Sequence, residues 1–282
     1  MRLSSFVLLV MLLTAEVFPQ ISPSVSNYFR YGTGERSLGT FKGDFRYSEN
    51  LTDIRVGLPY NFSAGVRILY DTPPETGLEY RGIKRRFAEY NDGDLFVRLG
   101  DFSSIYGRGL ALNLFEARGL GYDTWMDGLN IRYSRGMISG GLIYGDLDFK
   151  DSIEIARNEK HRIRGGNLEI TPVKNLKIGG SFIYSESNFN LVGFSKEEKV
   201  LLPSVYANYR AGKLSFIFDA AYKESENITD KSRSSGTGVF ASVTYIGDGF
   251  GITLDYKNYR YDERDPFGRN DITRSTRMLP FQ

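Results

Sequence analysis

The sequence predicts an all-β protein: an antiparallel transmembrane β-barrel with about thirteen strands visible, preceded by a signal peptide. Three observations predict this fold class. Apolar and polar side chains alternate with a period of two residues along most of the chain, which is the period of a strand. The alternating runs are about nine to eleven residues long, the length of a tilted membrane-spanning strand. The links between the runs are alternately short and long, as in barrels of the bacterial outer membrane.

The composition agrees with strands and excludes several classes of protein. The 31 Gly, 19 Tyr and 20 Phe among 282 residues favour strands and turns over helices. The lack of cysteine excludes disulfides, thiolate nucleophiles and Cys-ligated zinc, and the single histidine, His161, leaves little room for a multi-His metal site. The net charge of +2 gives no sign of nucleic-acid binding. We therefore expect no cofactor, no metal and no nucleic-acid partner.

The N-terminus indicates export. A short basic start, Met1-Arg2-Leu3, and the apolar run Phe6–Thr14 are followed by a polar stretch, which is typical of a secretory signal peptide. The run is too short for a membrane-spanning helix, which needs about 20 apolar residues. We assign residues 1–20 to the signal peptide, 21–36 to an N-terminal periplasmic segment and 37–282 to the barrel.

The alternation is clearest between Lys213 and Lys223. Leu214, Phe216, Phe218, Ala220 and Tyr222 fall on one face, and Ser215, Ile217, Asp219, Ala221 and Lys223 fall on the other. Several apolar faces end in Tyr, as expected of an interfacial aromatic girdle. Further runs of this kind lie at residues 64–70, 129–133, 176–185, 204–210, 239–245 and 250–257.

The lengths of the links decide what the apolar faces contact. Counted from Ser37, the links after even-numbered strands are tiny: Tyr60-Asn61, Asn91-Gly93, Arg135-Gly136, Thr171-Asn175, Ala211-Gly212 and Ile246-Gly249. Links after odd-numbered strands are mostly long and polar, except for a short first one around Ser48-Asn50: Asp71–Glu79, Ser103–Asp127, Asp148–Lys160, Glu186–Lys199 and Glu224–Ser235. Short turns at one end and long loops at the other indicate an outer-membrane barrel with its short turns in the periplasm. A secreted soluble β-protein remains the alternative.

The segment Ser103–Asp127 stands out among the long links. Its stretch Gly109–Glu116 resembles a strand, but counting it as one wall strand would invert the order of short and long links. We expect a single excursion that folds into the barrel mouth, because an apolar, Gly-rich segment is unfavourable in water. The alternative is an added hairpin of two wall strands.

Charged side chains on the polar faces of the strands are candidates for the lumen. An arginine-rich lumen favours anionic solutes, or its arginines pair with acidic side chains to fill a closed lumen. The candidates are Arg67, Arg98, Arg132, Arg210, Asp219 and Asp255.

No residue pattern predicts a catalytic site. His161 would need a nearby nucleophilic serine and an orienting acid to form a hydrolase site, and Ser152 is the nearest serine in sequence. We expect His161 to be an ordinary residue at the end of a loop and the protein to be no enzyme. An outer-membrane enzyme of the lipid-hydrolase type remains an alternative.

The stretch Val97–Tyr133 resembles an uncharacterised outer-membrane barrel family of the Bacteroidota and related phyla. The resemblance rests on Gly100-Asp101-Phe102, on the motif that follows it, and on Gly128 opening a strand. Asn113 stands where the family has a basic residue, so a shared role at that position is in doubt. The resemblance implies an outer-membrane location and no established activity. The motif residues, expected in the inserted loop, are Tyr106, Gly107, Gly109, Leu110, Glu116, Arg118, Gly121 and Asp123.

Together these observations predict a non-enzymatic β-barrel of the bacterial outer membrane, either a channel or a scaffold for a surface complex. Expected partners are outer-membrane lipid, small anionic solutes for a channel, and surface or periplasmic proteins for a scaffold.

The strand count predicts that the chain is the N-terminal part of a larger barrel. The last strand, 250–259, runs toward the long-loop side, residues 260–282 have the composition of an external loop, and single-chain barrels normally have an even number of strands. The alternative is a strand miscounted near Ser48-Asn50.

Overall fold

Strands are the only regular structure in the described part of the chain. The computed structural model describes residues 21–38, 41–75, 78–117, 122–151, 157–191 and 194–261. Thirteen strands form one antiparallel sheet in the order β1 to β5 and then β10 to β17, and four short strands form two separate pairs, β6-β7 and β8-β9. Within these residues the order begins at β1 and ends at β17, so the sheet is not closed. No described helix is long and apolar enough to cross a membrane. The prediction of an all-β antiparallel fold is confirmed.

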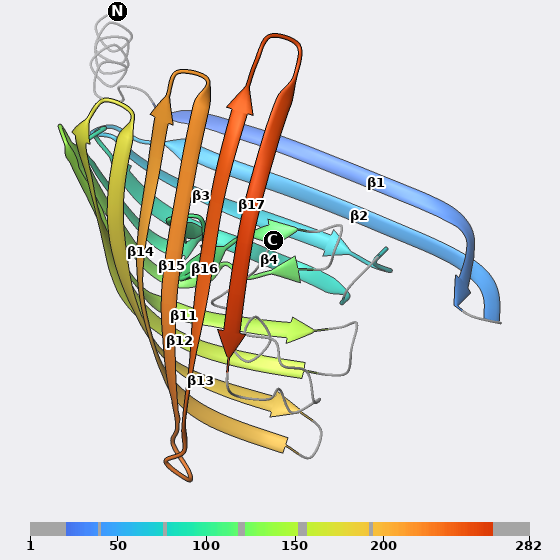
Figure 1. Ribbon diagram of the computed structural model, residues 1–282. Coiled ribbons are helices and arrows are strands. Elements are labelled where there is room, and N and C mark those ends of the chain that lie inside the picture. Colours follow the sequence, from blue (N-terminus) through green and yellow to red (C-terminus); the bar gives the residue numbers. More distant parts are fainter. Residues whose placement is uncertain are drawn as a thin grey trace, which may run out of the picture. The chain divides into compact units, whose positions relative to one another are not determined.

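The chain divides into two compact units, which we describe separately. The first covers residues 1–75 and 79–92 and contains four strands that pair with their sequence neighbours. Figure 1 labels them β1 (Ser22–Leu38), β2 (Phe41–Gly57), β3 (Phe62–Asp71) and β4 (Tyr80–Asn91).

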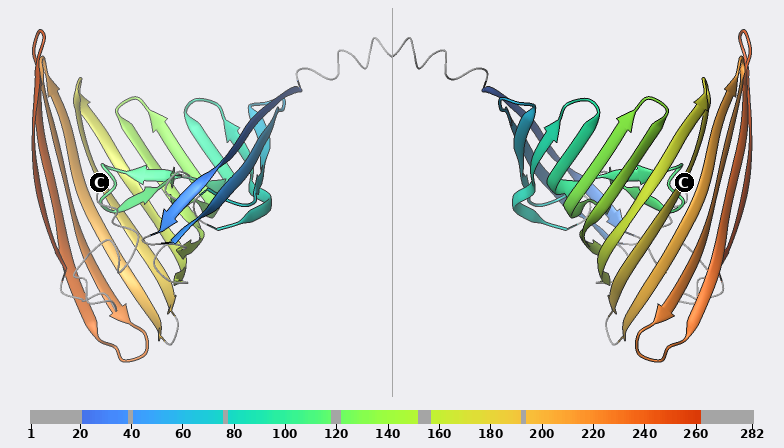
Figure 2. Two further views of the ribbon diagram at one scale, coloured as in Figure 1. Left: turned by 90° about the vertical axis from the view of Figure 1, so that its right-hand side faces the viewer. Right: turned by 90° about the vertical axis from the view of Figure 1, so that its left-hand side faces the viewer.

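The second unit covers residues 76–78 and 93–282. Its wall strands are β5 (Leu95–Phe102), β10 (Met126–Arg135), β11 (Ile138–Asp151), β12 (Arg157–Val173), β13 (Leu176–Leu191), β14 (Phe194–Ala211), β15 (Leu214–Asn227), β16 (Arg233–Ile246) and β17 (Gly251–Tyr261). The short strands are β6 (Ser104–Tyr106), β7 (Leu112–Leu114), β8 (Glu116–Ala117) and β9 (Tyr122–Asp123). Figure 2 shows these short strands on one side of the tilted wall strands of this unit.

The two faces of the second unit differ in polarity and burial. We call the face contacted by the segment between β5 and β10 the inner face, and the opposite face the outer face. On β15, Phe216, Phe218 and Tyr222 of the outer face are about 40% exposed (38–43%), whereas Asp219 and Lys223 of the inner face are fully buried. An apolar face that stays exposed is what a lipid-facing strand presents, so the period-two pattern marks a membrane barrel and not a soluble core.

The short turns close tightly because their residues tolerate left-handed backbone geometry. Gly136 has φ of 62° and Gly212 has φ of 58°, where a side chain would be strained. Asn61 and Asn175 adopt the same region, which asparagine enters more readily than most residues. The predicted short turns, those after the even-numbered wall strands, are therefore confirmed.

The structure differs from the sequence interpretation at the N-terminal end. Residues 21–36, expected to form a periplasmic segment, belong largely to strand β1, which pairs along its whole length with β2. The stretch Ser48-Asn50, expected to be a link, lies in the middle of β2. Its three residues stand opposite Tyr31, Arg30 and Phe29 of β1, in that order. The total of thirteen strands is correct, but the first two were misplaced, because continuous pairing with β1 keeps the polar centre of β2 extended.

Two of the long polar links are also shorter than expected. β13 continues to Leu191 and β14 begins at Phe194, so most of the predicted link Glu186–Lys199 is strand. The same holds at Asp148–Lys160, where β11 ends at Asp151 and β12 begins at Arg157. The strands keep their alternation after the outer face changes from apolar to charged, so composition alone was misleading there.

Candidate functional site

The segment between β5 and β10 lies on the inner face of the second unit. β5 and β10 pair directly with each other, from Met126 opposite Phe102 to Tyr133 opposite Leu95. The intervening residues contribute no strand to the wall and fold into the small pairs β6-β7 and β8-β9. The segment is therefore one excursion, and the alternative of an added wall hairpin is wrong.

An apolar core joins this inserted segment to the wall. Leu112 and Ala111 are fully buried, and Tyr106, Leu110 and Leu114 are 4–5% exposed. They cluster with inner-face residues of eight wall strands: Phe102, Met126, Ile143, Leu147, Phe149, Ile163, Ile183, Val200, Leu202, Ala221 and Phe240. Because burial of one large apolar side chain contributes roughly 1.5–3 kcal/mol, the segment is packed and not loosely tethered.

A polar contact holds the tip of the segment against β15. The backbone N–H of Arg108 donates to Oδ2 of Asp219 at 2.8 Å, and the Arg108 guanidinium lies 4.4 Å from the ring centroid of Phe240. Gly107 has φ of 59°, and a Cβ there would lie 2.7 Å from Cδ1 of Tyr206. Only glycine fits this close approach without displacing the wall side chain.

The segment also has its own internal order. Thr124, 1% exposed, accepts from the Phe115 amide with its hydroxyl at 3.0 Å, and its own amide donates to the Phe115 carbonyl. The pKa of the Tyr106 phenol is raised above its ordinary value, mainly because burial disfavours the phenolate. Burial and these bonds hold together the described parts of the segment, up to residue 117 and from residue 122.

The structure places most of the residues of the predicted loop motif within this segment. Leu110 and Tyr106 are in the core, and Gly109, with φ of 102°, lies in the hairpin turn. Glu116 stands opposite Asp123 in the β8-β9 pair. Arg118 and Gly121 lie outside the described residues.

The predicted lumen residues are divided between the two units and have separate partners. Arg67 makes two bonds to Asp53 in the first unit, with Nε at 2.7 Å and Nη2 at 3.0 Å from the carboxylate oxygens. In the second unit, Arg98 donates to the Asp101 carbonyl and Arg132 lies 4.0 Å from the centroid of Phe96. Arg210 on β14 and Asp255 on β17 are exposed. Asp219 on β15 accepts a hydrogen bond from the Arg108 amide of the inserted segment.

A buried polar network around His161 was not predicted. Nδ1 of His161 is 2.8 Å from the Ser187 hydroxyl, and Nε2 is 3.0 Å from Oε2 of Glu159. The Ser185 hydroxyl lies 2.9 Å from that of Ser187. All four side chains are at most 3% exposed. The serine that contacts His161 is thus Ser187, which stands opposite it on the neighbouring strand β13. Ser152, the nearest serine in sequence, lies outside the described residues.

No metal site is evident in the described part of the chain. Within these residues, His, Asp and Glu form no group of three or more that could hold a metal ion.

The open antiparallel sheet, with its apolar outer face and its inserted segment, defines the class of outer-membrane β-barrel proteins. Within this class, the chain belongs to the family described as "Family of unknown function (DUF6029)", which it matches over residues 5–271. No curated protein is significantly similar to the chain.

The comparison with solved structures finds one with a similar fold. An anion-selective porin from Comamonas acidovorans has a TM-score of 0.51 at 12% identity, covering 85% of this chain and 80% of the porin. The outer-membrane protein OmpT of Vibrio cholerae, in its trimer form, has a TM-score of 0.45 at 12% identity, covering 85% of this chain and 89% of OmpT. At such identities the likeness concerns the fold alone.

Proposed function

We propose that the chain is a passive, non-enzymatic channel of the outer membrane, narrowed by the inserted segment between β5 and β10. The observation that supports this proposal is the apolar core between the segment and the inner face. A segment packed in this way reduces the cross-section open to solutes while the wall strands remain intact.

Arginines near the segment favour small anionic solutes. Arg132, Arg98 and Arg108 lie on the inner face or on the segment itself, and guanidinium groups remain charged at any physiological pH. Arg132 and Arg108 are both exposed, so their charge acts on a passing solute. A positive constriction attracts anions and repels cations.

The test is conductance of the purified protein in planar bilayers. Replacing Tyr106–Gly121 with a short Gly-Ser link should raise single-channel conductance, and Arg132→Ala should shift the reversal potential toward lower anion preference. The matched control shortens the link Ile228–Ser232 between β15 and β16, which belongs to no part of the core, and should leave conductance unchanged. Unchanged conductance after the first replacement would contradict a narrowing role.

A folded barrel that never conducts would instead favour the scaffold alternative. In that case the inserted segment would stabilise the wall or present a surface to a protein partner. Heat-modifiable mobility on gels establishes folding independently of conductance, so a silent protein is distinguished from an unfolded one.

One specific observation bears on the enzyme alternative. Ser187, His161 and Glu159 are linked by hydrogen bonds in the sequence of nucleophile, base and acid that hydrolases use. All three side chains are nearly fully buried, and a substrate has to reach the serine hydroxyl for attack. We infer a structural hydrogen-bond network. Labelling of Ser187 by a fluorophosphonate probe, abolished in His161→Ala, would contradict this inference.

A further inference from the structure

The outer face of β11, β12 and β13 changes from apolar to charged along the strands. Leu142, Leu168 and Phe182 are 52–62% exposed in the apolar part, and Tyr144 marks its end on β11. Beyond them, toward the long-loop side, the outer face continues with Asp146 and other charged residues. The apolar part meets lipid tails, so the charged part stands at the level of lipid headgroups.

The apolar part contains a groove of about 830 Å³. Glycines replace side chains on its floor, and the large side chains of neighbouring positions form its walls. The lining residues that matter are Gly166, Gly180, Leu142, Tyr144, Leu168 and Phe182. Arg164 stands at the end of this groove and is part of its lining.

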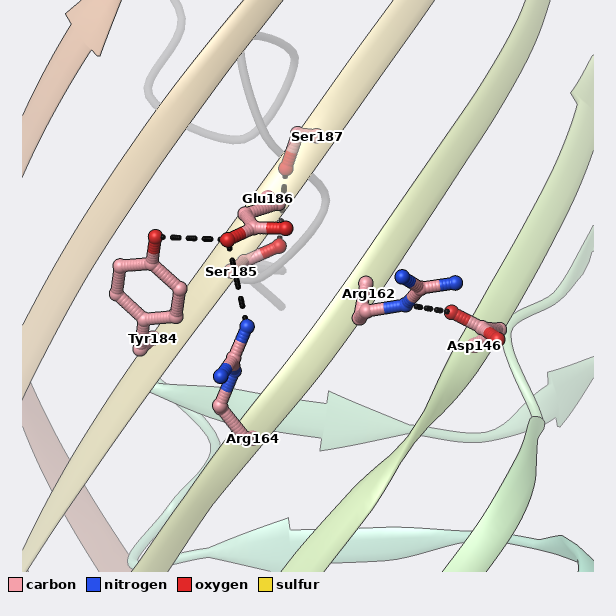
Figure 3. A network of polar contacts seen from close by, with 7 residues as sticks. All are labelled: Asp146, Arg162, Arg164, Tyr184, Ser185, Glu186 and Ser187. Carbon is pink, nitrogen blue, oxygen red and sulfur yellow. Dashed lines mark hydrogen bonds and ion pairs between the residues drawn. The ribbon is translucent and has the colours of Figure 1, made fainter.

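A second, polar groove of about 490 Å³ lies beyond Arg164 on β11, β12 and β13 and extends to Glu197 of β14 and to Ile228. Its charged lining consists of four carboxylates and two cations, which are Asp146, Asp148, Glu186, Glu197, Lys160 and Arg162, and Asn188 adds an amide. Figure 3 shows Arg162 reaching Asp146, and Arg164 reaching Glu186 beside Tyr184. Ser185 and Ser187, also drawn there, lie on the buried inner face of β13, the strand that carries Tyr184 and Glu186 on its outer face.

These ion pairs orient the guanidinium groups without using all of their donors. Nε of Arg162 bonds Asp146 at 3.0 Å, and Nη2 of Arg164 bonds Glu186 at 3.3 Å. The Arg164 guanidinium also lies 5.0 Å from the ring centroid of Tyr184, within range of a cation–π contact. Each guanidinium has five N–H donors, so both have donors to offer an outside anion such as phosphate.

We propose that this surface binds a phosphorylated glycolipid of the outer leaflet, with an acyl chain in the apolar groove and the phosphate on Arg162 and Arg164. The remaining carboxylates and Asn188 suit the hydroxyl groups of a sugar, because carboxylates accept hydrogen bonds from hydroxyls. The apolar groove, the arginines at its end and the polar groove follow one another along the strands. Their order matches that of the acyl chain, the phosphate and the sugar in one lipid molecule.

The proposal does not depend on conduction, because it concerns only the outer face. The probe is diphosphoryl lipid A, added to the refolded full chain in detergent and detected by native mass spectrometry. Phosphatidylglycerol tests whether any phosphate lipid suffices. We expect lipid A to remain bound at detergent concentrations that remove phosphatidylglycerol.

Two variants locate the site. Arg162→Ala with Arg164→Ala should weaken lipid A retention about tenfold or more, since a hydrogen bond to a charged group contributes at least that factor. Gly180→Val should block the apolar groove, because it places a branched side chain where the lining has only a glycine. The nearest atom to a Cβ there is the Ser204 carbonyl oxygen at 3.2 Å, so the backbone has to shift by a few tenths of an ångström, and folding of this variant is checked separately. The control is Arg233→Ala on β16, an exposed arginine paired with Glu226 outside both grooves.

Three outcomes would overturn the proposal. They are no lipid A bound to the wild-type protein, equal binding of phosphatidylglycerol, or equal loss in the Arg233→Ala control. A stable oligomer that Gly180→Val dissociates, with no lipid retained, would also overturn it and identify the groove as a contact between copies of the chain. Folding of every variant is checked by heat-modifiable mobility, and conductance should match the wild type throughout.

Discussion

The first unit and the inner face of the second unit arise from the same alternating pattern and differ in what covers them. In the first unit, Arg67 and Asp53 pair while 24% and 37% of their side chains remain exposed. In the second unit, Asp219 and Lys223 are fully buried and large apolar residues surround the inserted segment. The polar face of the first unit thus carries a partly exposed ion pair beside buried residues such as Glu49 and Leu51, whereas in the second unit an apolar core forms where the inserted segment packs.

The largest expected effect tests the core of the second unit. Leu112→Ala removes a fully buried side chain of the inserted segment and should cost about 2–5 kcal/mol of the free energy of unfolding, through lost transfer energy and a cavity. The measurement is urea unfolding in detergent, followed by fluorescence of the one tryptophan, Trp125, which lies where the segment returns to the wall.

The control for this prediction is Phe216→Ala on the outer face, where 38% of the side chain is exposed and detergent replaces the lost contacts. Equal destabilisation by Leu112→Ala and Phe216→Ala would mean that the segment contributes no core, and the comparison between the two units would fail.

A smaller effect tests the contact at the tip of the segment. Asp219→Ala removes the acceptor for the Arg108 amide, a bond to a charged group that contributes about 1.5–3 kcal/mol. The segment should detach more often, seen as larger current fluctuations and easier quenching of Trp125. Asp219→Asn keeps an acceptor oxygen but loses the charge, so its effect should lie between those of wild type and Asp219→Ala. Asp255→Ala on β17 is the control and should have no effect.

Alkaline pH should loosen the same segment. The pKa of Tyr106 is raised by burial, so the folded state holds the phenolic proton more tightly than the unfolded state, whose pKa is about 10. Stability from this group is complete below about pH 10 and decreases as pH rises further. Tyr106→Phe cannot ionise, so its Trp125 signal should change less between pH 10 and 12 than that of the wild type.

The sequence allowed the segment to be predicted because the evidence was local. The alternation of β15 and the positions of the short turns depend on residues near one another in the chain, and both agree with the structure, whereas some of the predicted long links are largely strand. A single excursion at Ser103–Asp127 followed from the order of short and long links alone.

The features that the sequence did not predict, strand β1 and the serine partner of His161, depend on the register between paired strands. Strand β1 reads as Ser, Asn and Gly among aromatic residues, and its extension depends on pairing with β2, which no local pattern specifies. The partner of His161 was missed for the same reason. Ser187 faces His161 only because β12 and β13 pair with those two residues directly opposite each other.

The smallest expected effect tests the first unit. A double-mutant cycle of Arg67→Ala and Asp53→Ala should give a coupling energy of about 0.2–1 kcal/mol, because a partly exposed pair gains little from Coulomb attraction in a hydrated environment. The measurement is urea unfolding at low and high salt, and added salt should reduce the coupling. A coupling of several kcal/mol, insensitive to salt, would mean that this face is desolvated. The two units would then share one kind of interior, and the inserted segment would not be what distinguishes them.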